Sequence, residues 1–183
     1  QMIVDMLPVL LADPKGALVL FASWRQMFQV LEDLDPQIKE RVLAQGELSK
    51  MEIIQRHKKK VSAGERSVIF GLASFAEGID LPGNLCEHVV IAKIPFAVPN
   101  DPVGATLSEW VEQQGGNSFQ EISLPDAILR LVQAAGRLLR TEQDRGVVTL
   151  LDQRVISKSY GRKILKAMPP FQLAIGQEPV STI

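Results

Sequence analysis

The chain has 183 residues, with 20 lysines and arginines against 21 aspartates and glutamates, and a formal net charge of −1. This length suits one domain, and an apolar fraction of 46% is enough for a substantial core. A single cysteine excludes an intrachain disulfide and a multi-thiolate metal site in this chain. No apolar stretch reaches the roughly 18 residues of a membrane span and no secretory signal opens the chain, so we predict a cytoplasmic location and no membrane partner. The start at Gln1 suggests a piece of a longer protein.

The first half of the chain alternates short apolar runs with helical periodicity. In chain order we predict a strand at Ala17–Ala22, a helix at Trp24–Leu34 capped by Ser23, a short strand at Arg41–Gln45, a helix at Ser49–Val61 and a strand at Ser67–Leu72. Continuously apolar strands of this kind are typical of a sheet that is covered on both faces.

The second half continues the alternation. We predict a strand at Glu87–Ile94, a helix at Asp101–Gln114 ended by two glycines, a long helix at Ser123–Leu139 with Pro125 in its first turn, a strand at Gly146–Leu151 and a helix at Lys158–Ala167. This order predicts an α/β domain over residues 1–171 with a mainly parallel central sheet flanked by helices, and a flexible tail over residues 172–183. Ligands of such sheets bind beyond the carboxyl ends of the strands.

The near-zero net charge is a cancellation between segments. Residues 54–66 carry a charge of +4 and residues 130–166 carry +6, whereas the rest of the chain carries −11. The basic run Arg56–Lys60 is either a solvated helical face or a contact for backbone phosphates.

The segment QAAGRLLR, residues 133–140, is the most informative stretch. On a helix, Gln133, Gly136, Arg137 and Arg140 are three and four residues apart and share one face. Gly136 would let another backbone or a ligand approach, and two arginines one turn apart can bind an anion such as a polyphosphate. The alternative is a solvated helical face with two ordinary arginines.

The segment ASFAEGIDLPG, residues 73–83, follows a predicted buried strand and holds two glycines and two carboxylates. Its position suits a loop that offers backbone N–H groups to phosphate, although a plain connecting turn would use the same residue types.

The two segments together resemble motifs V (SFAEGID) and VI (QAAGRLLR) of superfamily 2 helicases, in particular the DinG/XPD-like branch. GALVLFASWRQM, residues 16–27, is similar to the motif IV strand and loop of that branch, and residues 57–78 resemble the run into motif V of bacterial DinG helicases. The resemblance covers most of the chain in the family's order.

The resemblance implies a RecA-like fold, the second motor domain of an ATP-dependent DNA helicase that moves 5′ to 3′ on single strands and acts in repair or replication-associated unwinding. It implies ATP with Mg²⁺ shared with the first motor domain of the same polypeptide. It also implies a 4Fe–4S cluster in the parent protein, single-stranded and forked or otherwise structured DNA as partners, and a monomer. The chain has no Walker A or B motif, so we expect no ATP hydrolysis by this domain alone.

The resemblance also implies roles for particular residues. Arg137 and Arg140 match the motif VI arginines that reach the γ-phosphate, and Gln133 and Gly136 line the same cleft. Glu77, Gly78 and Asp80 match motif V, which couples the nucleotide site to the DNA track.

DNA contacts are implied for the motif IV residues Ser23, Trp24 and Arg25 and for Ser74 and Phe75 of motif V. Trp24 is either a base-stacking residue or a surface residue at a helix start.

Three further residues suggest chemistry but lack partners for it in the sequence. We expect Cys86 to be a buried small residue, and His57 and His88 lack metal-ligand spacing, so no metal site is predicted. Two other functions stay open: a non-catalytic nucleic-acid-binding or protein-interaction module of the same fold, and a small-molecule enzyme that uses residues 73–83 as a phosphate cradle.

Overall fold

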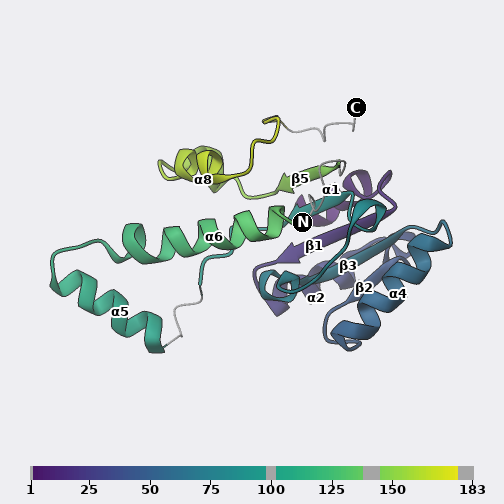
Figure 1. Cartoon of the computed structure of the whole chain (residues 1–183), viewed down its shortest axis with the longest axis horizontal. Coiled ribbons are helices and arrows are strands. Elements are labelled where there is room, and N and C mark those ends of the chain that lie inside the picture. Colours follow the sequence, from purple (N-terminus) through teal and green to yellow (C-terminus); the bar gives the residue numbers. More distant parts are fainter. Residues whose placement is uncertain (1, 98–101, 138–144, 177–183) are drawn as a thin grey trace.

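The computed structural model describes residues 2–97, 102–137 and 145–176. Five parallel strands form one sheet in the order β2-β3-β1-β4-β5. Their bounds are Gly16–Phe21 for β1, Val42–Ala44 for β2, Ser67–Leu72 for β3, His88–Ile91 for β4 and Val147–Leu150 for β5. The predicted mainly parallel sheet is confirmed, and β1 lies at its centre (Figure 1).

The side chains of β1 alternate between two apolar layers, which explains why its sequence is apolar throughout. Leu18 and Leu20 face one layer, which also contains residues of helices α4, α6 and α8. Val19 and Phe21 face the other layer, which contains residues of α1 and α2. The sheet is therefore covered on both faces, as predicted.

Helices occupy the connections between strands, the start of the described chain and the segment after β5. Their bounds are Met2–Leu10 for α1, Trp24–Asp33 for α2, Pro36–Lys39 for α3, Lys50–Ser62 for α4, Pro102–Gln113 for α5, Leu124–Ala135 for α6, Arg154–Ser157 for α7 and Gly161–Ala167 for α8. A π-helical turn, Phe119–Ser123, runs directly into α6. In Figure 1, α5 and the first half of α6 extend away from the sheet as an arm.

Side-chain caps fix the starts of α2 and α4 where the sequence predicted them. Ser23 Oγ accepts a hydrogen bond from Gln26 N at 3.3 Å. At α4, Ser49 and Glu52 form a reciprocal capping box, which satisfies backbone N–H groups that a helix start leaves without partners.

Several predicted boundaries are wrong. The sequence analysis missed α1, because its nearly uniform apolar run shows no helical face and contains Pro8. The short helix α3 was not predicted either; it begins at Pro36 behind the capping residue Asp35. The strand predicted for Glu87–Ile94 pairs only over His88–Ile91, and the helix predicted for Lys158–Ala167 begins at Gly161.

Candidate functional site

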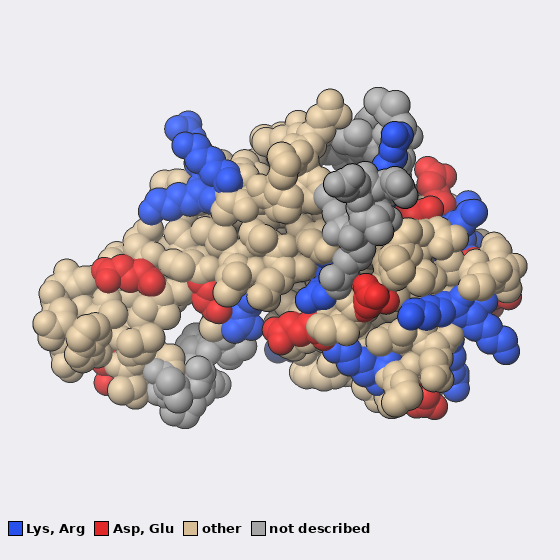
Figure 2. All heavy atoms as spheres, in the orientation of Figure 1, with Lys and Arg blue, Asp and Glu red and all other residues tan. Residues whose placement is uncertain are grey.

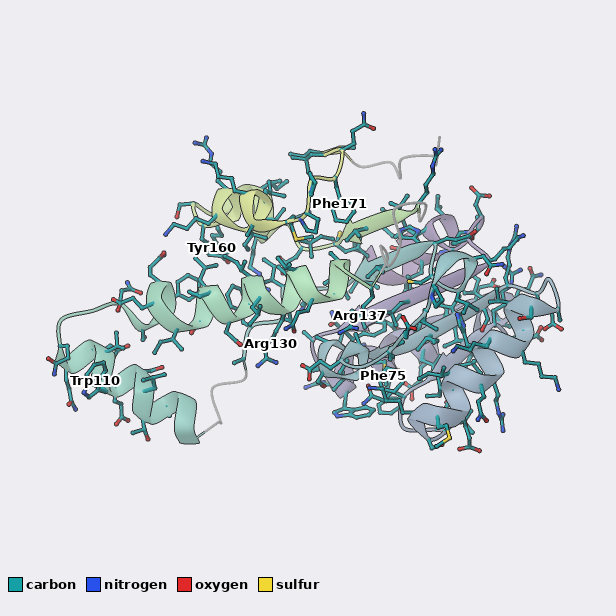
Figure 3. The ribbon with its side chains drawn as sticks, viewed as in Figure 1. Phe75, Trp110, Arg130, Arg137, Tyr160 and Phe171 are labelled. Atoms are coloured by element: carbon teal, nitrogen blue, oxygen red, sulfur yellow. The ribbon has the colours of Figure 1, made fainter. Side chains whose placement is uncertain are left out.

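The two sequence segments with the clearest chemistry lie in contact, although about 58 residues separate them in the chain. Arg137 Nη1 donates a hydrogen bond to the carbonyl oxygen of Ile79 at 3.1 Å, and both groups are at least partly buried. Figure 3 shows Arg137 at the end of α6, on the side of the molecule that holds Phe75. The fold therefore joins the loop at residues 74–80, which we call the SFAEGID loop, to the end of α6.

The end of α6 differs from the prediction. The helix stops at Ala135, Gly136 caps it with φ −64°, and Arg137 lies in the turn that follows. Gln133, Gly136 and Arg137 therefore do not share one continuous helical face. Gln133 is exposed and Gly136 is half-buried. Arg140 lies outside the described residues.

The SFAEGID loop combines a tied backbone with exposed polar side chains. It begins in a 3₁₀ turn, Ala73–Ala76, that directly follows β3. Gly78 adopts φ +71°, a left-handed conformation that favours glycine, and a Cβ there would meet nothing within 4 Å. Glu77 and Asp80 are exposed and Ile79 is buried between them. The loop thus presents two carboxylates and an open backbone.

The two residues predicted to contact DNA from this loop differ in accessibility. Ser74 is exposed, whereas Phe75 is only 6% exposed and belongs to the core. The Phe75 ring packs so closely on Gly71 that a Cβ at Gly71 would lie 2.7 Å from it. A base cannot stack on a covered ring, so we withdraw Phe75 as a DNA contact and assign it to holding the loop on β3.

The predicted motif IV residues are exposed after the carboxyl end of β1. The Ser23 hydroxyl caps α2, and Trp24 and Arg25 are exposed in the first turn of that helix. Trp24 is 42% exposed and stacks on Phe28, which is 41% exposed, with ring centroids 5.7 Å apart and planes 18° apart. The sequence analysis missed Phe28, although its place four residues after Trp24 on a helix was a usable signal.

Gly46 borders this aromatic pair. Its φ is +97°, and a Cβ there would approach the Trp24 ring to 3.1 Å. The turn after β2 therefore comes close to the start of α2, and a larger residue would push against the exposed ring.

Lys50 is a second residue that the sequence analysis did not single out. It is the first residue of α4, and its Nζ donates to the carbonyl oxygen of Glu77. The same Nζ lies 5.2 Å from the centroid of the Phe75 ring. No local sequence signal indicates this contact, because it joins the loop after β2 to the loop after β3.

Charged side chains are unevenly distributed over the surface. In Figure 2, blue side chains gather over α4 and α8, whereas the arm shows tan and red. Arg56, Lys58 and Lys59 of the basic run are exposed on α4, and Lys60 donates to the Glu40 carbonyl oxygen at 3.1 Å. The basic run lies beyond the middle of α4, away from the end of that helix that contacts the SFAEGID loop.

Asp152 follows β5 and links three segments at the carboxyl ends of the strands. Its carboxylate accepts a hydrogen bond from Ile94 N at 2.9 Å and pairs with Arg154, whose Nη2 lies 2.6 Å away. Burial opposes ionisation of Asp152, but the hydrogen bonds from Arg154 and Ile94 outweigh it and lower the pKa of the carboxyl. Arg154 also lies over the Phe96 ring, which packs with Phe119 and Tyr160. The pair is therefore part of the structural framework behind the site.

Both histidines are buried with two hydrogen-bond partners each. His57 contacts Ser67 Oγ at 2.9 Å and the Leu85 carbonyl oxygen at 2.7 Å. His88 contacts the Leu10 carbonyl oxygen at 3.0 Å and Thr149 Oγ1 at 2.8 Å. Because a carbonyl only accepts, the Nε2 of His57 and the Nδ1 of His88 carry the proton. The two rings thus have opposite tautomers and structural roles.

Cys86 is buried, as predicted. Among the described residues, no group of three or more His, Cys, Asp or Glu side chains is placed to hold a metal ion. In the same part of the chain, no helix is long and apolar enough to cross a membrane.

Comparison with known proteins identifies this arrangement. A family model described as the helicase C-terminal domain matches residues 6–171. The chain belongs to the helicase C-terminal domain family. This confirms the resemblance that the SFAEGID and QAAGRLLR segments indicated.

The relatives of this helicase C-terminal domain include bacterial DinG proteins. The ATP-dependent DNA helicase DinG of Photobacterium profundum is 42% identical over 178 residues, which are 96% of this chain and 26% of that protein. DinG of Escherichia coli K12 is 40% identical over 164 residues, 90% of this chain and 23% of that protein. The chain therefore spans about a quarter of the length of these relatives.

Solved structures of XPD helicases share the fold of the domain. One of them has a TM-score of 0.69 and 26% identity and is covered to 30% by this chain, which is itself matched over 91%. The apo form of an XPD protein gives a TM-score of 0.67 with 25% identity, and the match covers 91% of this chain and 34% of that one. The predicted RecA-like helicase fold is confirmed.

Proposed function

We propose that this domain is the second motor domain of an ATP-dependent 5′–3′ DNA helicase, and that Arg137 and Arg140 are its arginine fingers. The observation that carries the proposal is the hydrogen bond from Arg137 to the Ile79 carbonyl, since it joins the two segments that would meet ATP and DNA. Membership of the helicase C-terminal domain family and DinG relatives at 40–42% identity support it.

Phosphoryl transfer needs positive charge where the γ-phosphate develops negative charge. A guanidinium supplies that charge with planar donors, and an arginine delivered from a second domain contributes about 10³–10⁵ in rate in analogous enzymes. Arg137 is half-buried and donates to a neutral carbonyl here, so it can exchange that partner for a phosphate oxygen. Gln133 and Gly136 would line the same cleft, and hydrolysis would thereby depend on closure of two domains.

The exchange at Arg137 would also couple ATP to DNA. When Arg137 leaves the Ile79 carbonyl, the SFAEGID loop loses one of its ties, and the peptide between Ile79 and Asp80 can shift. Glu77, Gly78 and Asp80, which lie in the same loop, would pass this change on to the DNA strand. Ser74 is exposed on the SFAEGID loop, and Trp24 and Arg25 are exposed in the first turn of α2, whose start is set by Ser23. Trp24, backed by Phe28, would stack on a base, and the flanking backbone would meet phosphates.

The described residues of this chain do not provide the ligands for the metal cofactors that the parent protein would bind. Mg²⁺, when bound with ATP, neutralises the phosphate oxygens. The described residues offer it no cluster of ligands, so we place its ligands in the first motor domain of the same polypeptide. A 4Fe–4S cluster needs four thiolates, whereas this chain has one cysteine, which is buried. The cluster therefore belongs to another part of the parent protein.

Further properties of the parent follow from the same proposal. Its substrates would be single-stranded and forked or otherwise structured DNA, in repair or replication-associated unwinding, and it would act in the cytoplasm as a monomer. Residues 1–171 would form the motor domain and residues 172–183 a tail. This domain alone would not hydrolyse ATP, because it supplies fingers and no Walker motifs.

The test is the rate of DNA-stimulated ATP hydrolysis by the full-length protein. We expect Arg137→Ala to lower kcat by about 10³-fold or more. Arg130→Ala is the matched control, because Arg130 lies on the same helix and forms an ion pair with Asp126 that is only partly buried. Its kcat should stay within about twofold of the wild type, since such pairs contribute little. Normal hydrolysis by Arg137→Ala would overturn the proposal and favour a non-catalytic module of the same fold.

A further inference from the structure

Lys50 contacts the SFAEGID loop from outside both helicase motifs. Its Nζ donates to the Glu77 carbonyl and lies over the Phe75 ring, so one cation touches the exposed and the buried part of the same loop. No role for Lys50 is contained in the function proposed above. Figure 3 shows Phe75 near one end of α4.

The backbone that carries Lys50 is itself fixed. The Ser49–Glu52 capping box sets the first turn of α4, with Ser49 N donating to Glu52 Oε2 at 3.1 Å. Just before it, Gln45 Oε1 accepts a hydrogen bond from Leu72 N at 2.8 Å, where the chain leaves β3 for the loop. The segment between β2 and α4 therefore ties both the entry and the middle of the loop.

The tie to Glu77 has a consequence for the next residue. In a trans peptide the carbonyl and the following N–H point in opposite directions, and none of the described peptides is cis. Holding the Glu77 carbonyl toward Lys50 therefore directs the Gly78 N–H away from it. Gly78 is exposed, and a Cβ added to it would have no neighbouring atom within 4 Å. The space beside its backbone is therefore open.

Arg137 acts in the same way on the other side of Gly78. By holding the Ile79 carbonyl, it fixes the peptide between Ile79 and Asp80. The two cations thus orient two peptides of one short loop. They differ in one respect, because Arg137 is the proposed finger and would leave its carbonyl when ATP binds, whereas Lys50 would stay.

We propose that Lys50 is a positioning residue that aims the Gly78 N–H at a phosphate oxygen of the bound DNA or nucleotide. This inference rests on the proposed helicase function. The chemistry is that of an anion held by a backbone N–H in a loop that follows a strand. Lys50 itself touches no substrate, because its Nζ is already directed to the Glu77 carbonyl.

The experiment compares Lys50→Met and Lys50→Arg in the full-length protein. Methionine keeps the length and apolar stem of the side chain without a donor, and arginine restores a cation that can donate. DNA-stimulated ATP hydrolysis is titrated with single-stranded DNA at saturating ATP, and with ATP at saturating DNA. Lys166→Met, the same change at an exposed lysine on α8, controls for the loss of one charge.

For Lys50→Met we expect one half-saturating concentration to rise about 5- to 10-fold while kcat stays within about twofold. A rise for DNA identifies a DNA phosphate, and a rise for ATP identifies a nucleotide phosphate. Lys50→Arg should recover most of the loss, which a general defect in folding would not allow. Lys166→Met should behave like the wild type.

The inference is overturned if Lys50→Met leaves both half-saturating concentrations unchanged, or if it lowers kcat alone. It is also overturned if Lys50→Arg is as defective as Lys50→Met. Failure of the underlying function would look different, because the wild-type protein would then show no DNA-stimulated hydrolysis, or Arg137→Ala would retain it.

Discussion

The SFAEGID loop after β3 and the arm, residues 102–129, are both exposed, yet they are built in opposite ways. The loop hides its aromatic ring, exposes carboxylates and has backbone carbonyls held by two cations. The arm exposes Leu107, Trp110 and Leu129, which are 46%, 59% and 55% exposed, and its sequence has no lysine or arginine. The difference predicts that DNA contacts lie at the loop, where cations hold the backbone, and not at the exposed aromatic residue of the arm.

The arm is nonetheless well ordered at its turn. Gly115 adopts φ +80°, Asn117 N donates to Glu121 Oε1 at 2.9 Å, and Ser118 Oγ donates to Glu112 Oε1 at 2.6 Å. Both regions are thus held by hydrogen bonds, and they differ in charge and in the burial of their aromatic rings. Four substitution or titration experiments test this difference.

The largest stability effect should come from the glycine beneath the loop. In Gly71→Ala the new Cβ would lie 2.7 Å from the Phe75 ring, which packs against core residues and has little room to move. We expect a loss of about 1–3 kcal/mol in the free energy of unfolding, measured by urea denaturation. Gly136→Ala, where the Cβ would meet only carbonyls of its own helix, should cost less. Equal stability of the two variants would show that Phe75 does not pack as described.

The second experiment compares two exposed tryptophans. Trp24→Ala in the full-length protein should weaken binding of single-stranded DNA by roughly tenfold, within the range of one lost stacking contact. Trp110→Ala on the acidic arm should leave the affinity unchanged. Fluorescence anisotropy with a labelled oligonucleotide measures both. If Trp110→Ala weakens binding more than Trp24→Ala, the assignment of the DNA track is wrong.

The third experiment tests the two buried histidines, His57 of α4 and His88 of β4, by the pH dependence of stability. Burial lowers the pKa of His57 and of His88 below the ordinary value, so the unfolded chain binds more protons than the folded one. Their contribution to stability is present above the unfolded pKa, about 6.5, and is lost as pH falls below it. We expect the urea midpoint to fall between pH 7 and pH 5.5. A midpoint that rises over this interval would contradict the buried neutral rings.

Asp152 acts in a separate pH window. Because hydrogen bonds from Arg154 and Ile94 lower its pKa, its stabilising contribution is present above the unfolded carboxyl pKa, about 3.9, and is lost only in more acidic solution. Between pH 7 and pH 5.5 the change should therefore come from the histidines and not from Asp152, and His88→Gln should reduce its slope.

The smallest effect is expected for the exposed apolar residues of the arm. Leu107→Ser and Trp110→Ser should each change the free energy of unfolding by no more than about 0.5 kcal/mol, because the removed side chains are largely in contact with solvent. Thermal unfolding of the two variants beside the wild type measures this. A loss above about 2 kcal/mol would show that the arm's outer face is covered.

The sequence was sufficient for those parts of the fold that depend on local physics. β3 has the predicted bounds because an apolar run buried on both faces has no competing pattern, and α4 begins as predicted because Ser49 and Glu52 form a capping box. The end of α6 was not predictable in this way. Gly136 was read as part of a helical face, but tertiary contact draws Arg137 toward the Ile79 carbonyl.

The candidate site shows the same division. The segments and their meeting place follow from their residues and from the family, whereas the direction of each side chain depends on contacts between distant elements. Phe75 faces inward because Gly71 leaves space for its ring, and Lys50 meets Glu77 because two loops lie side by side. Neither contact can be predicted from the residues that neighbour Phe75 or Lys50 in the sequence.

The central place of β1 has a consequence for how the chain reaches its folded state. β1 pairs with β3 and β4, and in the register Gly16 lies opposite Ser67, 51 positions later, and Ala17 lies opposite His88, 71 positions later. Parallel partners this distant must be brought together against the entropy of closing long loops, which makes folding slow. Until then β1 is an apolar strand with two open edges, a form in which other chains can pair with it. α1 and α2, which pack on one face of β1, are its neighbours in the sequence, so that this contact closes only short loops.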